Sequence, residues 1–130
     1  MKMTGELWIL VASVGLAAVQ AAIVSDYMRR QTGNLYAIGP RDEYIPLTGM
    51  AGRMERAYRN MLETLPWFAI MVIVTHMTDR TNGTTLAGAY LYFGARVAYV
   101  PAYACGIPGL RSVIWWLAGI GILTIASQLF

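Results

Sequence analysis

The chain has 130 residues, of which 57% are hydrophobic and 13% are charged, and its formal net charge is +3. This balance indicates an integral membrane protein that leaves no room for a separate soluble domain, and it gives no sign of a nucleic-acid partner. The single cysteine, Cys105, and the single histidine, His76, exclude an internal disulfide and a cysteine-only or histidine-rich metal site, so no metal is expected.

Four apolar segments approach the ~20 residues that a helix needs to cross a bilayer. They predict transmembrane spans at about 7–28, 54–78, 84–104 and 110–129. We expect the first to be a span and not a secretory signal, because Glu6 interrupts the positive start and the apolar run continues to Asp26.

The connections between these spans differ in length. A segment rich in glycine and proline, about 31–52, predicts a surface loop, and its length beyond ~12–15 residues favours a lid over a site. The other two connections are short, so consecutive helices should be antiparallel neighbours. The predicted fold is all-α, a single domain over 1–130 built as an up-and-down bundle of four transmembrane helices.

Arginines predict how the bundle is oriented. Four of them fall between spans one and two and Arg111 follows span three, whereas only Lys2 and Arg80 mark the other side. By the positive-inside rule the first and third connections face the cytoplasm, and both termini lie on the non-cytoplasmic side.

The second span opens with a polar group of residues. Arg56, Arg59, Asn60 and Glu63 are spaced i, i+3, i+4 and i+7, so their side chains share one face of a helix. A charge at the centre of a span costs ~2.5–3.5 kcal/mol on insertion scales and usually has a function. These residues are candidates for a binding site.

Further polar residues come from the third and fourth spans. Arg96, Tyr99 and Tyr103 form one stripe at i, i+3 and i+7, and the fourth span begins with Arg111 and Ser112. Because span three ends where spans two and four begin, all these side chains lie at a similar depth. We expect them to face one cavity at the cytoplasmic end.

Such a cavity suits a small anionic, peptide-like molecule, because arginines bind carboxylates, glutamate accepts from an ammonium group, and asparagine and tyrosine pair with amides. Glutathione carries these groups together with a thiol, whose ordinary pKa is ~8.5. An arginine at ~4 Å favours the thiolate by up to roughly 4 kcal/mol at an effective dielectric near 20. One arginine is therefore a sufficient activator.

Plainer interpretations stay open. Arg59 pairs at i,i+4 with either Glu63 or Glu55, which would only stabilise the helix, and the tyrosines fit an interfacial belt or core packing. Arg29 and Arg30 fit topology and snorkelling better than ligand contact.

With these residues in view, the chain resembles the MAPEG family, the membrane-associated proteins in eicosanoid and glutathione metabolism, and is most similar to its small bacterial branch. The resemblance rests on Gly39-Pro-Arg-Asp42, Arg56-Ala-Tyr-Arg-Asn60-Met-Leu-Glu63 with Pro66, Ala95-Arg96-Val-Ala-Tyr99 leading to Tyr103, and Gly106-Ile-Pro-Gly-Leu-Arg111-Ser112.

The resemblance implies a homotrimer in a bacterial inner membrane, with glutathione as cosubstrate bound between neighbouring protomers and no metal. It implies glutathione contacts at Arg59, Asn60, Glu63, Tyr99 and Tyr103, and Arg56 matches a family arginine. With Arg111, and with Arg96 from the polar stripe of the third span, these are the predicted glutathione-binding residues. Arg111 resembles the family's thiolate-stabilising arginine, with Ser112 and Tyr99 as catalytic helpers. The first-helix arginine that a neighbour contributes corresponds to Arg29 or Arg30.

The leading hypothesis is thus a glutathione transferase or lipid hydroperoxide peroxidase, whose second substrate is a lipophilic electrophile or hydroperoxide that arrives among membrane lipids. The alternative is a non-catalytic lipid-binding protein or a structural subunit of a larger membrane assembly. A transporter is less favoured, because the polar residues cluster at one end of the bundle.

Overall fold

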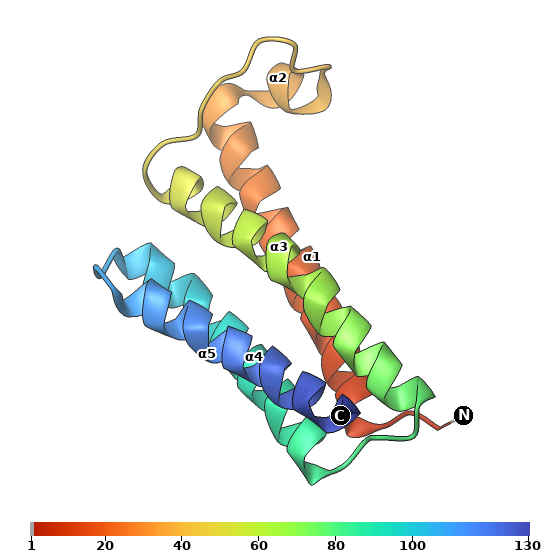
Figure 1. The fold of residues 1–130 in the computed structure, drawn as a ribbon. Coiled ribbons are helices and arrows are strands. Elements are labelled where there is room, and N and C mark those ends of the chain that lie inside the picture. The colour runs from red at the N-terminus through yellow and green to blue at the C-terminus, as the bar shows by residue number, and fades with distance from the viewer. Residues whose placement is uncertain (1) are drawn as a thin grey trace.

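The computed structural model describes residues 2–130, and every element in this range is helical. The long helices run alternately up and down, with both termini at one end, called here the terminal end (Figure 1). The opposite end, where α1 leads to α3 and α4 turns into α5, is called the loop end. The prediction of an all-α, four-helix membrane bundle is confirmed. The elements are α1 (Gly5–Thr32), α2 (Asn34–Ile38), α3 (Gly49–Met77), α4 (Gly83–Cys105), α5 (Leu110–Ala126) and η1 (Ser127–Leu129).

The long connection contains more helix than the expected loop of 31–52. Helix α1 continues to Thr32, α2 occupies five residues, and α3 already begins at Gly49, which leaves only Gly33 and 39–48 without helix. Gly33 ends α1 at a φ of 90°, a left-handed value that suits glycine, and it separates α1 from α2. Because glycines flank its five residues, the sequence pattern predicts a loop at this short helix.

The four long helices differ in how apolar they are. Helix α1 and the segment Leu110–Leu129 are each long and apolar enough to cross a membrane on length and composition alone. Helices α3 and α4 are as long, at 29 and 23 residues, but α3 carries the charged group that opens the second span and α4 holds Arg96. The polar residues of the candidate site thus account for part of the lower hydropathy.

Two features of the core fix the helices against one another. The rings of Phe68 in α3 and Tyr92 in α4 stack with centroids 4.1 Å apart, and the Tyr92 hydroxyl is 3.0 Å from Thr64 Oγ1. Helices α4 and α5 approach almost to backbone contact, because a Cβ added to Gly121 would lie 2.6 Å from the carbonyl oxygen of Gly88.

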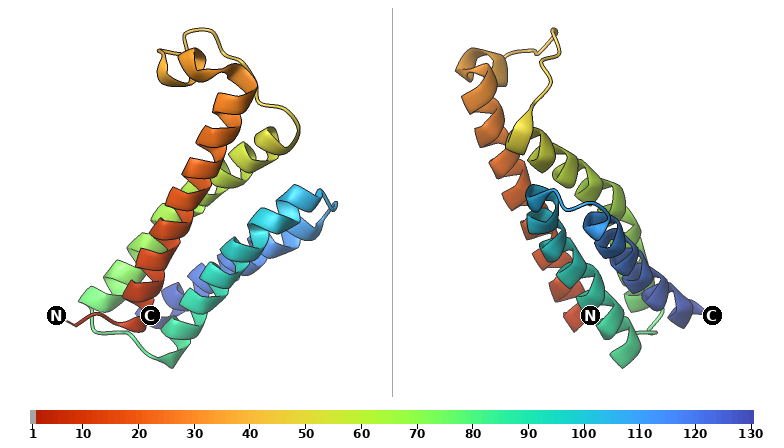
Figure 2. Two further views of the ribbon diagram at one scale, coloured as in Figure 1. Left: turned by 180° about the vertical axis from the view of Figure 1, so that it is seen from behind. Right: turned by 90° about the vertical axis from the view of Figure 1, so that its left-hand side faces the viewer.

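The helices form two pairs that diverge toward the loop end. In the front and back views, α1 and α3 lean away from α4 and α5, and the pairs come closest near the terminal end (Figures 1 and 2). There the Thr85 hydroxyl of α4 donates to the buried Glu6 carboxylate of α1. At the loop end the contact between the pairs depends more on long side chains, and this is where the candidate site lies.

Candidate functional site

Arg96 is the buried cation at the centre of the site. Its side chain is only 1% exposed, its Nη1 donates to Asn60 Oδ1 at 2.7 Å, and its Cζ lies 4.4 Å from the centre of the Tyr99 ring. The Nε and Nη2 atoms are also buried and have no hydrogen-bond partner within residues 2–130. The guanidinium therefore joins α3 to α4, and two of its nitrogens remain available to donate to another group.

Tyr103 is the second centre, one turn further along α4 than Tyr99. Its hydroxyl accepts from Arg56 Nε at 2.9 Å, and the Cζ atoms of Arg56 and Arg111 lie 5.6 and 5.1 Å from its ring centre. Contacts of this kind between guanidinium groups and aromatic rings are favourable. One phenol thus brings together arginines from α3 and from the start of α5.

Two cavities open on this cluster, and Arg111 lines both. The first has a volume of about 210 Å³ and the second about 220 Å³. The first, called the serine cavity, is lined by Asn60, Tyr99, Arg111, Ser112, Trp115 and Trp116. The second, called the arginine cavity, is lined by Arg53, Arg56, Ala102, Tyr103, Gly106, Ile107, Pro108 and Arg111. Polar groups from α3, α4 and α5 therefore meet in one protomer.

Three of the predicted residues line neither cavity: the buried Arg96, and Arg59 and Glu63. Arg59 is exposed and its Nη2 is 3.7 Å from Glu55 Oε1, so it pairs with Glu55 and not with Glu63. Glu63 is exposed and makes no ion pair or hydrogen bond with any residue in the described range.

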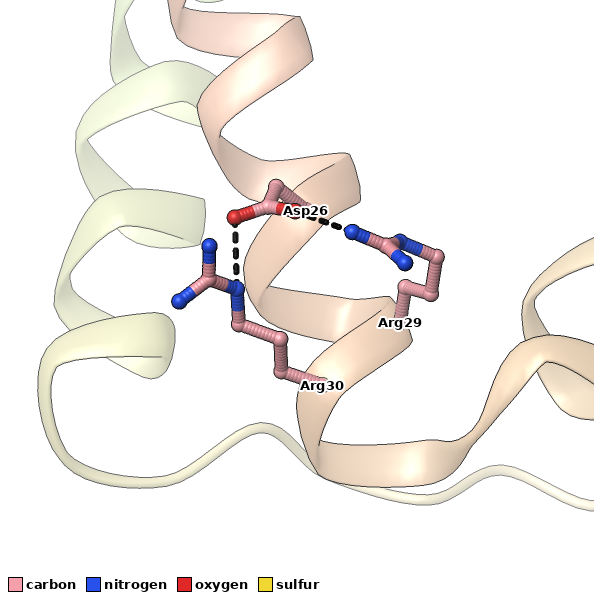
Figure 3. Close-up of polar contacts among 3 residues, drawn as sticks. All are labelled: Asp26, Arg29 and Arg30. Atoms are coloured by element: carbon pink, nitrogen blue, oxygen red, sulfur yellow. Dashed lines mark hydrogen bonds and ion pairs between the residues drawn. The ribbon is translucent and has the colours of Figure 1, made fainter.

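The two arginines at the end of α1 are held by a single carboxylate. Asp26 Oδ1 accepts a hydrogen bond from Arg29 Nη2, and Asp26 Oδ2 forms an ion pair with Arg30 Nε, each at 2.7 Å (Figure 3). The two guanidinium groups lie on opposite sides of Asp26: that of Arg30 lies on the side of α3, and that of Arg29 lies on the side away from α3. Neither lines the serine or the arginine cavity of its own protomer.

Sequence reasoning missed three residues that line the cavities. Arg53 is one of the four arginines between spans one and two that orient the bundle, and it also lies three residues before Arg56 and so on the same helical face. Trp115 and Trp116 carry no charge that distinguishes them within an apolar span, yet each lies four residues after a site residue, Arg111 and Ser112 respectively. Extending the i, i+3, i+4 spacing by one turn in both helices would have found them.

The fold and this cluster define a four-helix membrane protein with a cationic, tyrosine-rich site at one end of the bundle. The chain belongs to the MAPEG family, which it matches over residues 7–130. Members are four-helix membrane bundles, often trimeric, and many are glutathione-dependent transferases or peroxidases. A search of curated proteins and one of solved structures found no match to the chain.

Proposed function

We propose that the protein is a glutathione-dependent membrane enzyme that activates the thiolate for attack on a lipophilic substrate, as a transferase, a lipid hydroperoxide peroxidase, or both. The observation that carries this proposal is the position of Arg111, which lines two adjoining cavities and approaches the Tyr103 ring. A cation between two small polar cavities can neutralise a thiolate in one while an anionic end of the same ligand lies in the other.

The roles follow from the chemistry of each side chain. Arg111 stabilises the thiolate, and Ser112 and Tyr99 supply hydroxyl donors at the serine cavity. Asn60 pairs with an amide of the tripeptide. Arg56 binds a carboxylate, because its guanidinium is already oriented by the Tyr103 hydroxyl.

Arg96 is a positioning residue that does not line either cavity: it holds the Asn60 side chain and the Tyr99 ring in place. The indoles of Trp115 and Trp116 give the serine cavity an apolar wall for the lipophilic partner. The water-soluble and the lipid-soluble substrate are thus held next to each other in the serine cavity. Holding two reactants in place lowers the entropic part of the activation barrier.

Two reactions balance at such a site. In conjugation the thiolate sulfur forms a bond to an electrophilic carbon while the C–O bond of an epoxide or the π bond of an activated alkene breaks, and the oxygen or carbon that receives the electron pair takes up the proton that the thiol lost. In peroxide reduction the thiolate attacks the terminal oxygen, the O–O bond breaks to give an alcohol, and a second glutathione converts the sulfenic acid to disulfide and water.

We also propose that the working unit is a homotrimer with the loop end facing the cytoplasm of a bacterium. Arg59, Glu63, Arg111 and Ser112 are all exposed in the isolated protomer. Because exposed charges near hydrocarbon are costly, an arrangement in which a neighbouring protomer covers these side chains is favoured. In that arrangement Glu63 pairs with an ammonium group of the ligand or with a cation of the neighbour.

Calorimetry and thermal shift on the detergent-solubilised protein test the proposal. Glutathione at 100 times its dissociation constant should stabilise the protein by about 2.7 kcal/mol. The matched control is the tripeptide with serine in place of cysteine, which should bind without supporting turnover with a lipophilic electrophile. If millimolar glutathione gives neither heat nor stabilisation, the non-catalytic lipid-binding or structural interpretation is the better one.

A further inference from the structure

The arginine cavity holds three guanidinium groups and no carboxylate. Arg53, Arg56 and Arg111 all line its volume of about 220 Å³, whereas none of its lining residues is acidic. Within residues 2–130 the arginines that form ion pairs are Arg29, Arg30 and Arg59. The three arginines of the arginine cavity are not among them and have no carboxylate partner in this range. Like charges around one small space repel each other until an anion enters.

Arg53 is fixed in this position by the end of α4. Its Nη1 donates to the carbonyl oxygen of Ala104 at 2.9 Å, and Ala104 lies in the last turn of α4, where carbonyl groups have no partner within the helix. A cation at a helix C-terminus is also favoured by the helix dipole. The bond occupies one donor of Arg53 and leaves the rest of the fork available.

The turn after α4 is shaped to admit this side chain. Gly106 has a φ of +68°, and a Cβ built on it would lie 3.3 Å from Arg53 Cζ. The guanidinium therefore lies against a residue without a side chain, in a backbone conformation that glycine adopts readily. Arg53 and Arg56, three residues apart on α3, each bridge to the last turn of α4.

We propose that Arg53 completes an oxyanion site with Arg56 and Arg111, and that this site takes a carboxylate or an inorganic oxyanion. Three guanidinium forks around one cavity match planar or tetrahedral oxygens, and Arg forms charge-assisted, often bidentate hydrogen bonds with both. One source is a carboxylate of the tripeptide, which rests on the proposed function. The other source is a free inorganic anion.

The test is thermal stabilisation of the full-length protein by sodium sulfate, compared with sodium chloride at the same ionic strength. Wild type should respond to sulfate specifically, and Arg53→Met should weaken the apparent sulfate affinity about tenfold, as expected for loss of one charge-assisted contact of about 1.4 kcal/mol. Arg53→Lys keeps the charge but not the guanidinium fork, so its apparent sulfate affinity should lie between those of wild type and Arg53→Met. It replaces Arg53→Met in the test if that variant does not fold. The matched control is Arg80→Met, because Arg80 also donates to a backbone carbonyl, that of Gln128, but at the terminal end.

Competition with glutathione separates the two sources. If glutathione removes the sulfate response and its glycine ethyl ester does not, the tripeptide carboxylate occupies the site; if the two ligands stabilise additively, the site serves a free anion. Either result supports the site. A wild type that does not distinguish sulfate from chloride, or an Arg53→Met variant with the full sulfate response, overturns the inference. Sulfate binding without glutathione binding overturns only the proposed function, and the reverse result overturns only the oxyanion site.

Discussion

Replacing Arg96 and Asn60, separately and together, should have unequal effects on stability. Arg96 is almost fully buried, and Asn60 Oδ1 is its only hydrogen-bond acceptor within residues 2–130. Asn60→Leu leaves a buried cation without any acceptor, which should cost about 3 kcal/mol in the free energy of unfolding. Arg96→Met removes the charge and keeps most of the volume, so its cost should stay within about 1 kcal/mol.

The double variant should recover about 2 kcal/mol of the Asn60→Leu loss, because the unpaired charge is gone. Thermal unfolding in detergent, followed by circular dichroism, gives the comparison; at ~4 °C per kcal/mol, Asn60→Leu should melt roughly 12 °C below wild type. Arg59→Met is the control, since Arg59 is exposed and its ion pair is long, and it should stay within about 0.5 kcal/mol of wild type. Additive effects, or equal losses from the two single variants, would refute the argument that Asn60 compensates a buried charge.

Two further predictions concern packing and the ligand. Gly121→Ala should lower stability by about 1–3 kcal/mol in chemical denaturation, because its Cβ would meet the Gly88 carbonyl, whereas Gly119→Ala on the same helix meets no atom within 4 Å and should not destabilise. Tyr103→Phe keeps the ring but removes the oxygen that accepts from Arg56, so titration calorimetry should show glutathione affinity about fivefold weaker, or about 1 kcal/mol, with little change in kcat. An unchanged affinity would show that Arg56 is oriented by other contacts.

The fold could be predicted because its signals are long and periodic. Apolar runs near the length of a membrane span and short connections indicate an up-and-down bundle whatever the detailed packing. The short helix α2 could not be predicted, because it has only five residues, too few for a periodic pattern, and it lies between Gly33 and Gly39. Local signals therefore gave the bundle but not the structure of its longest connection.

The partners of the polar side chains at the loop end could not be predicted from the sequence. The i,i+4 rule allowed Arg59 to pair with either Glu55 or Glu63, and only the rotamers in the folded helix select Glu55. Likewise the spacing names no partner for Arg96 on another helix, and the crossing of α3 and α4 presents Asn60 to it. Sequence spacing gives the face on which a side chain lies, whereas partners on other helices depend on how the helices pack.

Arg53 shows the same limit for the binding surface. Its spacing places it on the face of Arg56, but its contact with Ala104 is 51 residues away in sequence and requires the diverging helix pairs to be bridged by a long side chain. From composition alone, Arg53 could not be distinguished from the other arginines of the connection between spans one and two.

The thiolate absorbance of bound glutathione in the ultraviolet tests the central claim most directly. Wild type should show it upon binding at a pH well below the ordinary thiol pKa of ~8.5. Arg111→Ala should still bind glutathione but lose this absorbance, and kcat should fall by about 10²–10³. An Arg111→Ala protein that keeps the thiolate signal, or one that loses binding and turnover in equal measure, would contradict the assignment of Arg111 as the group that stabilises the thiolate.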